Sequence, residues 1–399
     1  MTSRLIYGQD PTRIDAFGRV RASNPETLFD SKQIFDNQPL FWDDSEESGT
    51  GTTSTHSTDA ARTRIGVSLN TAGKRTRQTF QRFNYQPGKS QLILMTTVMS
   101  SGNNSGIKAS VGYFDDENGL FFTNDEGTLK AVRRTYVTGV AVDNEVTQAN
   151  WNGDKLDGTG PSGVTLDPTK TQIIFIDFEW LGVGRVRMGF VIDGAFIVAH
   201  EFLNTNNLDV VYMSTPNLPL RYQIENDGTG AATTMDHICS TVISEGGQQA
   251  LGVLRHVDSG SVSGLASGTV YAMIGIRLQS TKLDGIVDLI NQSLIASSSN
   301  DQAHWEIRFN PTVAGTFTYS NETNSIVQTA TGAVTNTVTG GTHIDGGYFV
   351  TGQPSISSLE NALKLGAAID GTVDEIVLCV QPITNNITVE ASLTWRELS

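Results

Sequence analysis

Two carboxylates, Asp177 and Glu179, stand two positions apart in the segment FIDFEWLG at residues 175–182. The alternation of apolar and polar residues there indicates a β-strand, in which residues i and i+2 point to the same face. Two carboxylates near one another are the arrangement that cleaves glycosidic bonds, with one acid as nucleophile or base and the other as proton donor. The first chemistry to consider is therefore hydrolysis of a sugar polymer.

This segment resembles the signature of retaining β-glucanases built on a concanavalin-like jelly roll, in which one strand carries Glu-x-Asp-x-Glu. The resemblance implies a nucleophile, a helper aspartate and a general acid. Asp177 and Glu179 match the second and third positions, but Phe175 stands where the nucleophile would be. A phenyl ring cannot attack an anomeric carbon, so we expect no catalytic residues and no enzyme activity. The two acids are expected to be polar-face residues, or to contact a glycan together with Trp180.

Metal, nucleotide and acyl-transfer chemistry find no support in the sequence. The acidic run DDEN at 115–118 offers oxygen ligands for Ca²⁺, but it lacks the glycine and the later glutamate of a calcium loop, which favours a solvated hairpin tip. The six histidines are scattered, and no phosphate-binding loop or nucleophile elbow occurs. Cys239 and Cys379 are far apart and are expected to be buried free thiols. We expect no metal and no cofactor.

Composition restricts the partners. The chain has 399 residues and a formal net charge of −15, so no basic surface is available to neutralise a row of phosphates, and direct nucleic-acid binding is disfavoured. No apolar run reaches the length that crosses a bilayer, which argues against membrane insertion. The first ten residues, MTSRLIYGQD, lack the apolar core of a secretory signal, so we expect folding in a cytosol.

The elements that would position these residues are predicted to be strands. Short alternating runs separated by Gly, Asn and Asp recur from residue 63 onward, and Asp193-Gly194 between two such runs predicts a hairpin turn. We predict an all-β chain with two β-sandwiches in series. Residues 61–246 would form a jelly-roll-like, concanavalin-like sandwich and residues 247–399 a second sandwich. Within the second, 284–296 is interpreted as a strand and 358–365 as a short helix.

Residues 1–60 have isolated apolar side chains without a period, and 45–58 form a polar low-complexity segment that is typical of a linker or exposed loop. A disordered tail and an arm that orders on another subunit are both compatible with this pattern. We favour an extended N-terminal arm, because large apolar residues are too frequent for a solvated tail. The residues assigned to assembly are Arg13, Phe17, Arg19, Arg21, Leu28, Phe29 and Phe35.

Two regions carry a family resemblance: RIDAFGRVRASNPETLFDSKQIFD at 13–36, and a C-terminal part with RFNPTVAGTFTYS, GTVDEIVLCV and LTWREL. Together they resemble virion structural proteins of tailed, often marine, bacteriophages. The resemblance implies an all-β, non-enzymatic component present in many copies in the virion, made in the host cytoplasm. Its partners would be other virion proteins, capsid or tail subunits, and analogy suggests a homo-oligomer such as a trimer.

Two roles on such a particle are considered. In the first, the chain is a head-associated decoration or cement protein anchored by its N-terminal arm. In the second, it is a tail or fibre component that binds host surface glycans, with aromatic residues such as Tyr113, Trp151 or Trp180 as stacking platforms. The first role is preferred, because no long repeat or coiled-coil stem typical of a fibre occurs.

Overall fold

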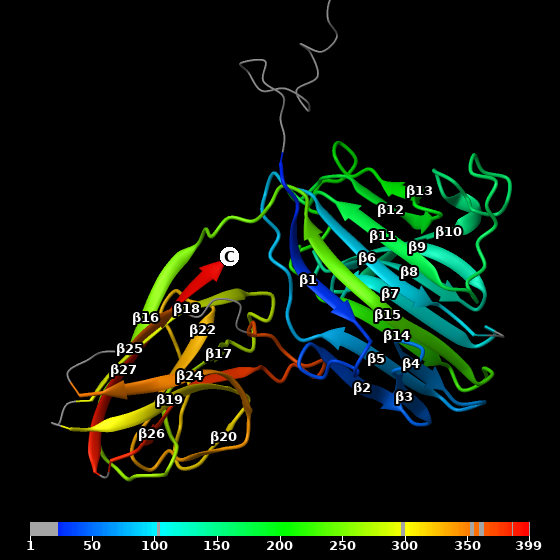
Figure 1. Ribbon diagram of the computed structural model, residues 1–399. Helices are drawn as coiled ribbons and strands as arrows, with labels where there is room; N and C mark the ends of the chain where they lie inside the picture. Colours follow the sequence, from blue (N-terminus) through cyan, green and yellow to red (C-terminus); the bar gives the residue numbers. More distant parts are fainter. Residues whose placement is uncertain are drawn as a thin grey trace, which may run out of the picture.

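The computed structural model describes residues 23–101, 104–296, 300–351, 355–358, 363–384 and 386–398. These residues form antiparallel strands in two separate sandwiches, one built from β1 to β15 and the other from β16 to β27 (Figure 1). The prediction of an all-β chain with two β-sandwiches is confirmed. In the described part of the chain, no helix has the length and hydropathy to span a membrane.

The first sandwich packs an eight-stranded sheet against a seven-stranded one. The eight-stranded sheet has the order β13 (Ala195–Phe202), β12 (Val186–Ile192), β11 (Gln172–Phe178), β6 (Gln91–Val98), β15 (Thr233–Ser244), β4 (Arg62–Val67) and β3 (Thr52–Ser57), with β1 (Glu26–Lys32) also paired to β15. The seven-stranded sheet has the order β10 (Val142–Thr147), β9 (Thr128–Thr135), β8 (Gly119–Asp125), β7 (Ile107–Phe114), β14 (Leu220–Asn226), β5 (Gly73–Thr79) and β2 (Trp42–Gly49). A 3₁₀ turn, η2 (Gln148–Asn150), follows β10.

The second sandwich has a four-stranded and a six-stranded sheet. The four-stranded sheet has the order β16 (Val253–Leu265), β27 (Ile387–Leu398), β18 (Ile286–Ala296) and β25 (Ser355–Ser358). The six-stranded sheet has the order β21 (Ser320–Asn321), β22 (Val327–Thr331), β17 (Tyr271–Leu278), β26 (Glu375–Pro382), β19 (Gln302–Phe309) and β24 (Thr342–Val350). Two short strands, β20 (Thr312–Val313) and β23 (Val338–Thr339), pair with each other.

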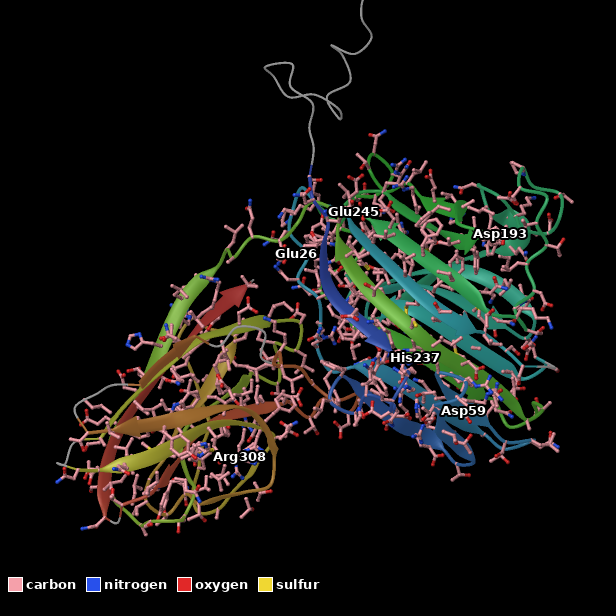
Figure 2. All side chains as sticks on the ribbon, in the orientation of Figure 1. Glu26, Asp59, Asp193, His237, Glu245 and Arg308 are labelled. Atoms are coloured by element: carbon pink, nitrogen blue, oxygen red, sulfur yellow. The ribbon has the colours of Figure 1, made fainter. Side chains whose placement is uncertain are left out.

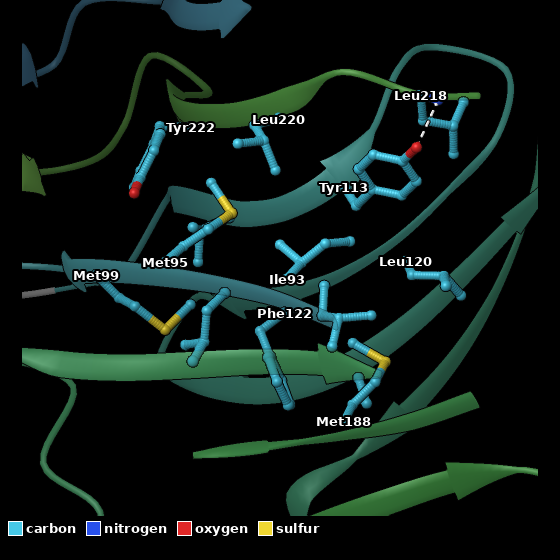
Figure 3. Close-up of a cluster of buried hydrophobic side chains, with 14 of the residues drawn as sticks. Ile93, Met95, Met99, Tyr113, Leu120, Phe122, Met188, Leu218, Leu220 and Tyr222 are labelled. Carbon is cyan, nitrogen blue, oxygen red and sulfur yellow. Dashed lines mark hydrogen bonds between the residues drawn. The ribbon is translucent and has the colours of Figure 1, made fainter. Parts of the chain in front are cut away.

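Alternation of apolar and polar side chains explains why these segments form strands. In β6, the sequence QLILMTTV has every second residue buried, which places Ile93 and Met95 between the sheets. They meet Tyr113 and Phe122 from the opposite sheet and Met188 from β12 (Figure 3). The Tyr113 hydroxyl accepts a hydrogen bond from the Leu218 backbone N–H at 3.0 Å and donates to the Pro216 carbonyl at 2.9 Å, which satisfies its polar end inside the core.

Several local predictions can be compared with the structure. The Asp193-Gly194 turn joins β12 to β13, and both residues have positive φ, of 51° and 80°. The ambiguous segment at 284–296 is a strand, β18. Both cysteines are free, but Cys239 is only half-buried, whereas Cys379 is buried as expected. The helix predicted at 358–365 falls largely on residues outside the described ranges; Ser358 ends β25, and 363–365 are not helical.

The structure corrects the prediction of an arm over residues 1–60. Residues 1–22 lie outside the described part, but strands β1, β2 and β3 belong to the first sandwich. The polar segment at 45–58, interpreted as a linker, contributes to both β2 and β3, which lie at the edges of the two sheets. Edge strands are exposed on one side and need few apolar residues, which explains why composition misled the prediction.

A buried charge holds β2 against its neighbour. Arg77 of β5 has no exposed surface, and its Nη1 donates to Asp44 Oδ2 at 2.7 Å. Its Nη2 donates to the Asn37 carbonyl at 2.7 Å, and its guanidinium lies 5.7 Å from the ring centre of Trp42. Arg75 also pairs with Asp44, at 2.6 Å. The loop and strand that precede β3 are therefore required to neutralise a charge inside the sandwich.

Residues 245–252 connect the sandwiches and are held by the first one. Gln86 Nε2 donates to the Gln249 carbonyl at 2.6 Å, and the Gln249 N–H donates back to Gln86 Oε1 at 3.0 Å. Across the interface, the Ala367 N–H donates to the Phe80 carbonyl at 3.0 Å, and the Ile369 N–H donates to Asp43 Oδ2 at 2.7 Å. These bonds fix the relative position of the two sandwiches.

Asp44→Ala is expected to lower the free energy of unfolding of the first sandwich by about 3–5 kcal/mol, because Arg77 would remain as a buried charge without its carboxylate. Urea denaturation followed by circular dichroism measures this change. The matched control is Asp30→Ala, which removes the partner of Lys32 from a pair of 2.9 Å whose side chains are 59% and 62% exposed. The control should cost far less stability, because an exposed ion pair is screened by water, and equal losses in the two variants would contradict the assignment.

Candidate functional site

A groove with a cavity volume of about 530 Å³ lies between the two sandwiches. The first sandwich contributes two loops, 84–89 and 214–217, together with Trp180. The linker contributes Gln249 and Leu251, and the second sandwich contributes Lys282, Asp284, Gly285, Ile326 and Leu398. A concave, largely apolar surface with a few polar groups at a domain boundary is the usual form of a small-ligand site.

Trp180 is the aromatic residue best placed to contact a ligand there. It lies two residues after the end of β11, and its backbone N–H donates to the Tyr85 hydroxyl at 2.9 Å. Its indole Nε1 donates to the Met213 carbonyl at 3.2 Å, and the Tyr85 ring meets it edge-on at 6.2 Å. The side chain is half-buried and lines the groove. The indole is thus held in one orientation with part of its surface available.

Polar groups surround Trp180. Asn217 is fixed, because its Oδ1 accepts from the Tyr85 N–H at 2.9 Å and its Nδ2 donates to the Asp284 carbonyl at 3.2 Å. Lys89 Nζ is bound to Gln86 Oε1 at 2.7 Å and to the Gly247 carbonyl at 2.9 Å. The Asp284 carboxylate has no hydrogen bond or ion pair with any of the described residues. The groove therefore offers an aromatic face next to donors, acceptors and one uncommitted carboxylate.

A second, more polar chamber of about 420 Å³ shares Ser214, Thr215 and Asp284 with the first. Arg221, only 2% exposed, forms its floor and donates to Asp116 Oδ1 at 2.6 Å. Arg82 pairs with Asp115 at 2.5 Å. Although burial acts in the opposite direction, Arg221 lowers the pKa of Asp116. The two chambers are therefore neighbours that have Ser214, Thr215 and Asp284 in common.

The acidic turn at 115–118 closes the β7–β8 hairpin, as its sequence predicts, but it is not the solvated tip expected, because Asp115 and Asn118 are buried. The Asp115 carboxylate accepts from the Glu117 and Asn118 N–H groups at 2.9 and 2.8 Å, so its oxygens stabilise the turn itself. Burial and the nearby Asp115 raise the pKa of Glu117. Among the described residues, no group of three or more His, Cys, Asp or Glu side chains is arranged to hold a metal ion.

The structure does not bring Asp177, Glu179 and Trp180 to one place. Asp177 points from the outer face of β11 and is paired with Arg187. Glu179 lies beyond the end of β11, is exposed, and accepts from the Arg185 N–H at 3.2 Å. Only Trp180 reaches the groove. Trp180 has the parity of Phe178, which points into the core, so the alternation of a strand already separates it from Asp177.

Other residues considered from sequence are also placed. Tyr113 and Trp151 are 0% and 3% exposed, so neither is a stacking platform. Leu28 is half-buried and Phe29 is buried against the rings of Phe41, Trp42 and Phe83 in the first core, whereas Phe35 is 87% exposed. The other residues assigned to assembly, Arg13, Phe17, Arg19 and Arg21, lie outside the described ranges.

The comparisons with known proteins give structural likenesses only. No family model matches the chain, and no curated protein matches it. The Emp47p carbohydrate recognition domain is 11% identical, with a TM-score of 0.33, and the match covers 57% of this chain and 99% of that one. The CBM2 module of the evolved Dit of Lactobacillus casei BL23 phage J-1 is 8% identical, with a TM-score of 0.37, covering 57% and 100%. A carbohydrate esterase from the Shiga toxin-encoding bacteriophage phi24B is 11% identical, with a TM-score of 0.29, covering 55% and 99%.

Phage proteins and carbohydrate-binding modules are thus among the structures similar to this chain. TM-scores at this level carry no argument about what the chain binds. The candidate site is therefore judged from its own residues.

The loop that borders the polar chamber, 366–374, carries a carboxyl that affects stability. Burial raises the pKa of Asp374 to about 6, and Oδ1 accepts from Asn310 Nδ2 at 2.8 Å. Because the folded state holds this proton more tightly than the unfolded state, stability contributed by the protonated carboxyl is lost as the pH rises through 6. Asp374→Asn is expected to raise the free energy of unfolding by about 1–3 kcal/mol at pH 7.5 and to change it little at pH 4.

Urea denaturation at the two pH values measures this effect. The control is Asp370→Asn in the same loop, since the Asp370 pKa is lowered by the Thr372 N–H, which donates to it at 2.8 Å. That variant should not be stabilised at pH 7.5. If Asp374→Asn does not raise the free energy of unfolding at pH 7.5, the buried, ionised state of this side chain is contradicted.

Proposed function

We propose that this chain is a non-enzymatic structural protein of a tailed-bacteriophage virion that binds surface glycans in the groove between its two sandwiches. The observation that carries the glycan-binding part is the position of Trp180, held by Tyr85 and Met213, beside amides and the Asp284 carboxylate in a cavity of about 530 Å³. The virion part is supported by the sequence resemblance at 13–36 and in the C-terminal region.

A sugar ring has two kinds of surface, and the groove offers a partner for each. A pyranose has a face of C–H groups that packs on an indole, and an edge of hydroxyls that both donate and accept hydrogen bonds. Asn84, Gln86, Asn217 and Asp284 supply partners of both kinds around Trp180. The Asn217 side chain is already oriented by Tyr85, so part of the entropy cost of ordering the site is met before a ligand binds.

The absence of catalysis is supported by the surroundings of the carboxylates. Phe175, in the nucleophile position of the glucanase-like pattern, is 2% exposed beneath Phe196. Asp177 is paired with Arg187, and the groove containing Trp180 does not include Glu179. A retaining mechanism needs two carboxyl groups at one scissile bond, and this strand does not supply them.

Of the two virion roles, we place glycan binding by a tail or fibre component ahead of head decoration. The decoration role depended on a long arm, and β1, β2 and β3 place residues 26–57 in the first sandwich instead. The groove, by contrast, is a feature of the described residues. Head decoration remains the alternative, and assembly as a homo-oligomer with capsid or tail subunits is part of the proposal.

Trp180→Ala is expected to weaken glycan binding at least tenfold, which is a loss of about 1.4 kcal/mol, because the stacking face is removed. The ligand is first found on an array of bacterial surface oligosaccharides, and affinities are then measured by calorimetry. The matched control is Tyr348→Ala, which removes an aromatic ring that is 74% exposed on β24, away from the groove. Equal binding by both variants would contradict the assignment of the groove.

The same assay tests the non-enzymatic part. Wild type and Glu179→Gln should both leave a bound glycan intact. Hydrolysis by wild type that is lost in Glu179→Gln would contradict the proposal.

A tag placed after Ser399 and located by cryo-electron microscopy of purified particles tests the virion role. We expect density on the tail, where a glycan-binding protein contacts the host surface. Density spread over the head would favour decoration, and particles without the chain would contradict a virion role altogether.

A further inference from the structure

The outer face of the eight-stranded sheet carries apolar side chains on five neighbouring strands. They come from β6, β11, β12, β13 and β15 and point away from the core: Leu92, Leu94, Ile173, Phe175, Val191, Phe196, Val198 and Ile243. Ile173 and Phe196 are 40% and 54% exposed. We call this set the outer apolar face. A contiguous apolar surface of this kind usually has a partner.

A hollow of about 270 Å³ lies within the outer apolar face. Phe175 forms its base, and the Phe196 ring stands edge-on to it at 5.1 Å. Asp177, paired with Arg187, and Glu245 line its rim. The hollow therefore suits a large apolar side chain followed by positively charged neighbours.

The described chain begins at this rim. The Ser23 hydroxyl donates to the Glu245 carbonyl at 2.9 Å, and Glu26 pairs with Ser244 in the ladder between β1 and β15. Figure 2 shows Glu26 and Glu245 close together, where β1 starts and β15 ends. The first described residue, Ser23, therefore lies at the edge of the hollow.

The sequence just before Ser23 is complementary to this face. It reads DAFGRVRAS at 15–23, with Phe17 two residues before Arg19 and with Val20 between Arg19 and Arg21. Six extended residues span about 20 Å, and neighbouring strands are about 4.8 Å apart. Phe17 can thus reach any strand from β15 to β13, while Arg21 stays near Glu245.

We propose that residues 13–22 lie across the outer apolar face of their own sandwich, with Phe17 in the hollow beside Phe196 and Arg19 and Arg21 facing Asp177 and Glu245. The segment covers apolar surface that would otherwise remain in contact with water. The segment is joined directly to Ser23, so docking within one chain is favoured over docking on a neighbour, because the effective concentration is high.

Disulfide trapping tests the proposal on the full-length protein. Phe17→Cys and Phe196→Cys are combined in a Cys239→Ser background, since Cys239 is half-buried on the same sheet face. After mild oxidation at low protein concentration, we expect most of the protein as an intramolecularly linked monomer that migrates faster on a non-reducing gel. The matched control combines Phe17→Cys with Tyr348→Cys, at a ring in the second sandwich that is more exposed than Phe196, and should give at least tenfold less intramolecular product.

Disulfide-linked dimers as the main product would show exchange between copies and would overturn docking within one chain. A crosslinking yield no higher than that of the control would overturn docking on this face. Charge reversal provides a second measurement, because Arg21→Glu should slow trapping several-fold and the added change Glu245→Arg should restore it. Failure of that rescue would overturn the assigned ion pair.

Discussion

The buried guanidinium of Arg77 is the constraint on which the first sandwich depends. A charge between two sheets needs a carboxylate and carbonyl partners, and Asp44 and Asn37 supply them from the segment before β3. Burial and the adjacent Arg77 lower the pKa of His237 well below its usual range, so this imidazole stays neutral where it stacks on Tyr222 at 4.2 Å. The N-terminal strands are therefore part of the folded core.

From this core, the positions of the groove residues follow. The Tyr85 ring stacks on Phe178 at 5.8 Å, and its hydroxyl receives the Trp180 N–H, so the indole is held by the same aromatic layer that fills the sandwich. The linker is held next to it by Gln86 and Lys89. A ligand that touches Trp180 and Asp284 would contact two bodies whose relative position is already fixed. This arrangement favours binding to a preformed groove over binding that requires the two sandwiches to move together.

The predictable parts of the fold were those encoded locally. Period-two alternation in β6 and the Asp193-Gly194 turn depend on neighbouring residues, and both were readable from sequence. The polar edge strands β2 and β3 were not, because their stability comes from distant partners such as Arg75 and Arg77. The groove was also hidden, since Tyr85, Trp180, Asn217 and Asp284 come from four separate loops with no common spacing. Of the predicted glycan-contact residues, only Trp180 lines this groove.

The pairing of β1 with β15 has a consequence for biosynthesis. Ser23 and Glu245 are 222 residues apart, yet they share a hydrogen bond at the end of this ladder. At ribosomal speeds of about 5–20 residues per second, the first strand waits about 10–40 s for its partner to be made. During that interval the nascent chain must keep its N-terminal apolar residues from pairing elsewhere. The first sandwich therefore completes its sheet only after most of the domain has left the ribosome, and its folding is expected to be slow, as for other folds dominated by distant contacts.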